Sequence, residues 1–139
     1  MNAAEGLLAV AEGLGLVGGN TGWKGFNDHF AGDDRTIAFM QEPGRQPEVG
    51  VAINYPSVQI LGRGTANGYS ALSQKMADLF NGLHGIPQSV SQPHYQELVS
   101  CVARGYIQNL GKDDNNRPMM SLNFNLITAP INLGHRPNY

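Results

Sequence analysis

Apolar residues recur at helical spacing in two parts of the chain. The first pattern predicts a helix over residues 3–17, ended by Gly18-Gly19. The second predicts a helix that Ser70 caps and that Gly85 and Pro87 end. The apolar face of the first helix is formed by Leu7, Val10, Ala11, Leu14 and Val17. The apolar face of the second helix is formed by Leu72, Met76, Leu79, Phe80 and Leu83.

Other segments alternate between apolar and polar residues, as half-buried strands do. Thr36–Gln41 and Ser57–Arg63 are the first two predicted strands. Residues 97–110 are rich in β-forming residues and lead into the turn-forming residues 111–116, so with the strand that follows they predict a hairpin. In that strand the core face is formed by Met120, Leu122, Phe124 and Leu126, and the opposite face by Ser121, Asn123 and Asn125.

The remaining segments lack a clear period. Residues 20–34 mix Gly, Asn, Asp and aromatic residues, which indicates an irregular loop held down by Trp23, Phe26 and Phe30. Val51–Ile53 could add a short edge strand. The polar tail after Pro130 cannot pack on its own, so it is either mobile or docks on another subunit.

The order of these elements is α-β-β-α-β-β, which predicts an α+β fold. We expect one domain over residues 1–139, with a mostly antiparallel four-stranded sheet packed on two helices and an extended tail at residues 130–139. A chain of 139 residues is in the usual size range for one hydrophobic core.

Composition narrows the class of protein. The formal net charge is only −2 and no run of basic residues is present, so we expect no specific nucleic-acid binding. Charged residues make up 14% of the chain, about half the usual share, and a neutral polar surface suits packing against other subunits. The apolar stretch Leu7–Val17 contains Glu12 and follows no basic residue, which predicts neither a signal peptide nor a membrane span.

Two glycine-rich segments resemble nucleotide-binding loops. Gly13, Gly15 and Gly18 match G-x-G-x-x-G, and Asp33-Asp34 follow at the distance of a ribose-binding acid, but a helix precedes the glycines where that motif requires a strand. We therefore interpret them as a helix end. Gly62–Gly68 joins a predicted strand to a predicted helix, so an enzyme that binds an anion or a nucleotide there remains an alternative.

No other residues form a recognisable chemical site. The four histidines, at 29, 84, 94 and 135, are scattered over loops and predict no metal site. Cys101 lies within a predicted strand and is expected in the core. The pairs Asp33-Asp34 and Asp113-Asp114 are expected to form turns. The sequence thus predicts no catalytic residue, metal or cofactor, and favours a protein that is not an enzyme.

Three ordered segments resemble a known family. The first is Tyr55-Pro56-Ser57-Val58-Gln59-Ile60-Leu61-Gly62-Arg63-Gly64, similar to a "P-x-V-Q-x-x-x-R-G" strand. The second is Asp78-Leu79-Phe80-Asn81-Gly82-Leu83-His84-Gly85, similar to a helix that closes on "aLhG". The third is the turn Leu110–Arg117 followed by Ser121-Leu122-Asn123-Phe124, similar to "lG-x-D-x-x-x-R-x-x-x-s-x-n-F". In their order and spacing these segments resemble the tail terminator, or tail-completion, proteins of long-tailed bacteriophages.

This resemblance implies a structural protein of the virion. Such a subunit forms a ring, commonly six-fold, that caps the tail tube and joins it to the head-side connector or stopper protein. The implied partners are other copies of the chain, the tail tube protein and the connector, with no membrane. The implied location is the head-proximal end of the tail, after assembly in the host cytoplasm. We expect subunit or tube contacts at Arg63, Asp113, Asp114, Asn115, Asn116, Arg117, Ile131, Asn132, Leu133, His135, Arg136 and Tyr139.

Two other binding roles remain open at this point. A head-tail connector of similar fold would show the same sequence pattern. A small peptide-binding module could use an open sheet edge near Val51–Ile53.

Overall fold

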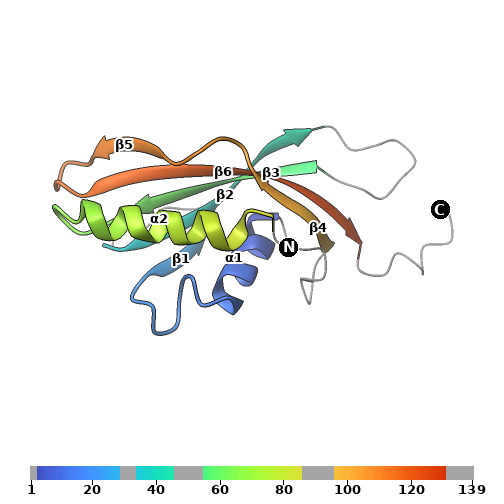
Figure 1. The fold of residues 1–139 in the computed structure, drawn as a ribbon, viewed down its shortest axis with the longest axis horizontal. Coiled ribbons are helices and arrows are strands. Elements are labelled where there is room, and N and C mark those ends of the chain that lie inside the picture. Colours follow the sequence, from blue (N-terminus) through green and yellow to red (C-terminus); the bar gives the residue numbers. More distant parts are fainter. Residues whose placement is uncertain (1–2, 29–33, 46–54, 86–95, 131–139) are drawn as a thin grey trace, which may run out of the picture.

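The computed structural model describes residues 3–28, 34–45, 55–85 and 96–130. It contains two helices and one six-stranded mixed sheet, and both helices lie on the same face of the sheet (Figure 1). In chain order the elements are α1 (Ala3–Gly13), β1 (Lys24–Asn27), β2 (Thr36–Arg45), β3 (Tyr55–Arg63), α2 (Tyr69–Leu83), β4 (Gln96–Ala103), β5 (Gln108–Lys112) and β6 (Pro118–Pro130).

The sheet is antiparallel except at one edge. Its strand order is β1-β2-β3-β6-β4, with β5 also paired to β6, and only β1 and β2 run parallel. β4 pairs with residues 124–130 of β6, and β5 pairs with residues 118–121 of the same strand. β4 and β5 therefore follow one another along the same edge of β6, as two parts of one interrupted strand.

The α+β class is confirmed, but the predicted element order is wrong in two places. Residues 24–27, predicted to be part of an irregular loop, instead form β1, because β2 supplies backbone partners from Thr36 to Phe39. The region 97–110 contains two strands separated by residues 104–107, where Gly105 has a φ of +92°. The observed order is α-β-β-β-α-β-β-β. Val51–Ile53 lies outside the described residues.

The first helix is shorter than its apolar pattern predicted. It ends at Gly13, and Leu14, expected on its buried face, is exposed. Gly15, with a φ of +74°, reverses the chain so that Val17 returns to the core. Lys75 of α2 holds this returning segment, because its Nζ donates to the Leu16 carbonyl at 2.8 Å and lies 6.0 Å from the centre of the Trp23 ring. Trp23 is buried, and Phe30 is outside the described residues.

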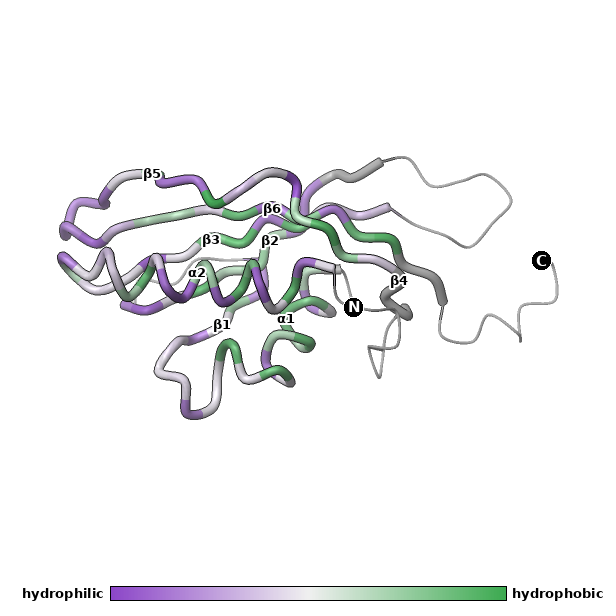
Figure 2. Tube along the Cα trace, viewed as in Figure 1, coloured by the Kyte–Doolittle hydropathy of each residue, from purple (hydrophilic) through white to green (hydrophobic). Residues whose placement is uncertain are grey.

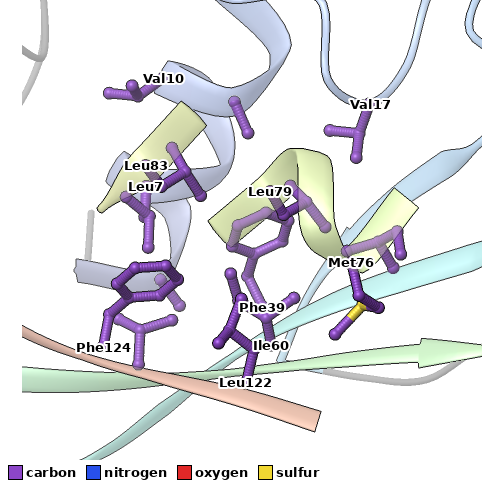
Figure 3. Close-up of a cluster of buried hydrophobic side chains, with 14 of the residues drawn as sticks. Leu7, Val10, Val17, Phe39, Ile60, Met76, Leu79, Leu83, Leu122 and Phe124 are labelled. Atoms are coloured by element: carbon purple, nitrogen blue, oxygen red, sulfur yellow. The ribbon is translucent and has the colours of Figure 1, made fainter. Parts of the chain in front are cut away.

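The core lies between the helices and β2, β3 and β6 (Figure 3). All four residues predicted on the core face of β6 are buried, and so are Ile37, Phe39, Val58 and Ile60 of the neighbouring strands. The opposite face of β6 is less exposed to solvent than predicted. Asn125 is exposed, but Ser121 is buried beside Gln108 of β5. Figure 2 shows α2 alternating between apolar and polar residues along its length, as expected for a helix with one face on the sheet.

Gly62 lets α2 lie close to β3. A Cβ atom at this position would be 2.8 Å from the Met76 sulfur and 2.9 Å from Leu72 Cδ1. The helix begins at Tyr69 with Gly68 as its N-cap, and no side chain caps it. The predicted cap by Ser70 is therefore wrong, because Ser70 already lies in the first turn. Among the described residues, neither helix is long and apolar enough to cross a membrane.

Candidate interaction surface

The β5–β6 turn is built around Asp113. Its Oδ1 accepts hydrogen bonds from the backbone N–H groups of Asn115 and Arg117, at 2.9 and 3.0 Å. The Asn116 N–H donates to the Asp113 carbonyl, and Asn116 adopts a φ of +60°. Asn tolerates this left-handed conformation better than most residues. The predicted turn and hairpin are therefore confirmed.

Arg117 connects this turn to the start of β2. Its Nε donates to Asp113 Oδ2 at 2.9 Å, and its Nη1 donates to Asp34 Oδ1 at 3.1 Å. The hydrogen bond to Asp34 is the main reason that the pKa of Arg117 is raised, with Asp113 adding to the effect against partial desolvation. Desolvation raises the pKa of Asp113, but the hydrogen bonds from the Arg117 and Asn115 N–H groups and from the Arg117 side chain together lower it below its ordinary value of 3.8.

The β3–α2 loop joins the same structure through backbone hydrogen bonds. The Asn67 N–H donates to the Asn116 carbonyl at 3.0 Å, and the Gly64 N–H donates to the Pro118 carbonyl at 3.1 Å. Three segments thus meet at one end of the sheet, seen at the left of Figure 1: residues 34–35, 64–68 and 112–117. We refer to them as the loop end.

The turns of the loop end are connected by internal hydrogen bonds. Arg35, Asn67 and Asn116 each have a positive φ, a conformation that surrounding contacts must maintain. Its exposed polar side chains carry both signs of charge: Asp34, Arg35, Asn67, Lys112, Asp114, Asn115 and Asn116. This is a preformed polar surface of mixed charge.

The other residues predicted to make contacts are placed differently. Arg63, at the end of β3, is buried, with 8% of its surface exposed, and has an interaction partner within the chain. A contact through Arg63 stays a prediction, and only a small part of its surface is accessible to a partner in the single chain. Ile131, Asn132, Leu133, His135, Arg136 and Tyr139 lie outside the described residues.

Several backbone N–H groups of the loop Gly62–Gly68, which a bound anion would need, already donate hydrogen bonds within the protein. The N–H groups of Gly64, Asn67 and Gly68 donate to the carbonyls of Pro118, Asn116 and Thr65. Bound phosphates in glycine-rich loops depend on such N–H groups being free to point at the ligand. This geometry weakens the anion-binding alternative.

The remaining candidates for chemistry have structural positions. The segment Gly13–Gly18 follows the end of α1, as the interpretation as a helix end predicted. Cys101 is buried, as predicted, and burial raises the pKa of its thiol to about 12.

His84 follows the last residue of α2, stacks on Phe80, and accepts a hydrogen bond from the Ala103 N–H at its Nδ1. His29, His94 and His135 lie outside the described residues. Within the described part of the chain, no group of three or more His, Cys, Asp or Glu residues could hold a metal ion.

One ion pair was missed because its partners are far apart in the sequence. Arg104 follows β4, and its Nη2 lies 3.3 Å from Glu42 Oε1 on β2. The register places Asn123, Ser57 and Asn125 between them, on the sheet face that no helix covers. No local pattern in the sequence could have indicated this pair.

The sequence profile of bacteriophage tail terminator proteins matches residues 25–130. This range contains β2 to β6, α2 and all of the loop end, and it is more than half of the chain. The chain belongs to the bacteriophage tail terminator family. No curated protein matches the chain significantly.

Membership of the family confirms the resemblance stated from the three sequence segments. Tail terminators are structural rather than enzymatic proteins, and they belong to the tail of the virion. This member of the family therefore associates with other components of the phage tail and head. A surface with few charges and a hydrogen-bonded polar loop end are consistent with such a role.

The charge of Asp113 gives the loop end a predicted pH dependence. Because its pKa is lowered in the folded protein, the ionised carboxylate stabilises the fold above the ordinary value of 3.8, and this contribution is lost as the pH falls through the lower folded value. Asp113→Asn keeps an oxygen acceptor for the turn but removes the charge. We expect the difference in urea midpoint between wild type and D113N to be constant near neutral pH and to shrink below about pH 4. A difference that persists unchanged to about pH 2 would exclude this role.

Proposed function

We propose that this tail terminator forms a ring of identical subunits, six in the commonest arrangement of the family, that caps the tail tube. The ring joins the tube to the head-side connector, after assembly in the host cytoplasm. The observation that carries the proposal is the family match over residues 25–130, which extends through the sheet, α2 and the loop end. Closed rings are a common result of head-to-tail association of identical subunits.

The loop end is the proposed contact with the tail tube. Its turn is already ordered by Asp113, Arg117 and Asp34, so binding would cost little conformational entropy. Asp114, Asn115 and Asn116 are exposed on this turn and available to a partner. The residues of the C-terminal tail, Ile131–Tyr139, are the proposed contact with a neighbouring subunit, and Arg63 adds a minor contact at most.

Two measurements on the purified protein test the ring and the tube contact. Light scattering and negative-stain images should show a ring with six copies of the chain, and the ring should cosediment with isolated tail tubes. A strict monomer at high concentration that also fails to bind tubes would contradict the proposed function. The location of the subunit in intact particles distinguishes a terminator on the tail tube from a connector on the head side of the joint.

Substitutions on the turn separate tube binding from ring formation. The double variant Asp114→Arg and Asn115→Arg changes two exposed side chains without removing the Asp113 and Arg117 contacts. We expect it to form rings and to bind tubes about tenfold more weakly or worse, because two long charged side chains replace the native contacts directly at the interface. Asn81→Arg, an exposed position on α2, is the matched control and should bind normally. Normal binding by the double variant would place the tube contact elsewhere.

A further inference from the structure

Exposed apolar side chains gather along the flank formed by β4 and β5. Of five large apolar residues that are exposed in the described part of the chain, Val102, Tyr106 and Leu110 belong to this flank. We call these three residues the β5 flank. Tyr106 and Leu110 are 68% and 50% exposed. They are spread along one edge of the sheet, where several exposed apolar side chains are typical of a contact with another protein.

The backbone around Leu110 turns this side chain outward. Asn109 pairs with Met120 and Gly111 pairs with Met119, so Leu110 is an extra residue on β5, a β-bulge. Gly111 has a φ of +92°, and its N–H is held by Asn109 Oδ1 at 2.9 Å. Bulges at sheet edges commonly redirect a side chain. The sequence Asn109-Leu110-Gly111 therefore builds a local structure that exposes a leucine.

Tyr106 is also held in place while it remains exposed. Its ring contacts Phe80 of α2 edge to face, at 5.2 Å between ring centres, and Phe80 stacks on His84. An aromatic ring that is fixed before binding contributes area at a low entropic cost. The Arg104 side chain, the one charged group between Val102 and Leu110, is directed to Glu42. The β5 flank thus presents apolar groups without a competing free charge.

A second apolar group lies on the opposite flank of the sheet. Leu14 directly follows α1 and is 51% exposed. Leu16, two residues further on, packs on Lys75 and Gly82 of α2, whereas Tyr106 packs on Phe80, so Leu14 and the β5 flank lie on different sides of this helix. Figure 1 shows β5 at the top of the view and α1 with β1 at the bottom.

The position of these two surfaces favours one kind of partner. A two-fold contact of the β5 flank with itself would leave Leu14 in water, whereas a head-to-tail contact between copies of the chain covers both surfaces at once. Direct pairing of β5 with another strand is disfavoured by the bulge and by Lys112 at its end. A partner on this edge would therefore be bound through side chains.

We propose that the β5 flank of one copy packs against the Leu14 surface of the next copy, and that this head-to-tail contact builds the ring. The inference rests on the proposed ring and specifies which surfaces form it. Each subunit then has one surface of each kind, and all of these surfaces are occupied only when the ring closes.

Single substitutions on the two surfaces test this contact. Leu110→Asp and Leu14→Asp each place a charge in one of the two surfaces, and each should weaken self-association about thirtyfold or more, the effect of losing an interface hot spot. Tyr69→Asp is the control, because Tyr69 is 49% exposed but lies at the start of α2, outside both surfaces. An acid is favourable in the first turn of a helix, so this control should fold and form rings. Circular dichroism and thermal midpoints verify that all three variants fold. If L110D does not fold, the double variant Leu110→Ser with Tyr106→Ser replaces it.

Mixing the two variants distinguishes the head-to-tail contact from other arrangements. L110D retains an intact Leu14 surface and L14D retains an intact β5 flank, so an equal mixture should form dimers of one copy of each and no larger ring. If wild type forms rings and folded L110D still does, this inference is overturned while the proposed function stands. Rings lost in L110D but intact in L14D would also overturn it, since the β5 flank would then contact a surface other than that of Leu14. A wild-type protein that neither self-associates nor binds tubes would contradict the proposed function itself.

Discussion

Phe124→Ala is expected to destabilise the protein by about 3–5 kcal/mol, the range for truncating a buried phenylalanine. Phe124 is fully buried on β6, where it lies beneath Leu7 of α1 and Leu83 of α2 (Figure 3). The substitution removes a contact between the sheet and both helices and leaves a cavity that the rigid sheet cannot fill. Against a typical total of about 5–15 kcal/mol, this loss leaves the fold marginal.

Urea unfolding followed by circular dichroism measures this loss. Asn81→Ala, at an exposed position of α2, is the surface control and should change the free energy of unfolding by no more than about 0.5 kcal/mol. If F124A costs less than about 1 kcal/mol, the side chain does not occupy the centre of a packed core.

Gly62→Val is expected to cost about 1–3 kcal/mol by overpacking. Valine suits a β-strand, so the backbone of β3 would accept it, but its side chain would meet Met76 and Leu72 of α2. Because Met76 is flexible, Gly62→Ala should cost less than Gly62→Val. The penalty therefore increases with the volume of the added side chain.

Gln59→Val is the matched control for Gly62. Gln59 lies on the same strand, half-buried on the face that the helices leave uncovered. We expect a change within about 0.5 kcal/mol in its urea unfolding. Equal effects at positions 59 and 62 would show that α2 does not approach β3 closely at Gly62.

The loop end was predictable in part. The composition of residues 111–117, with Gly, Asp and Asn together, indicates a tight turn for local backbone reasons, and the structure has one. The partner of Arg117 was not predictable, because Asp34 precedes it by 83 positions and no periodicity connects the two. The burial of Arg63 was also missed, since a charged residue at a strand end is usually exposed.

The sequence by itself determined most of the core residues of α2 and all of those predicted in β6. Helical spacing in α2 and strict alternation in β6 assign side chains to a face through local geometry alone, and every core-face residue of β6 is buried. Only the tertiary structure decided the extent of α1, the existence of β1 and the position of Leu110. Leu14 continues the helical pattern but follows a glycine end, β1 is a strand because β2 supplies its hydrogen bonds, and the bulge at Leu110 exists only against β6. These features depend on partners distant in the chain, which a local pattern of apolar residues does not encode.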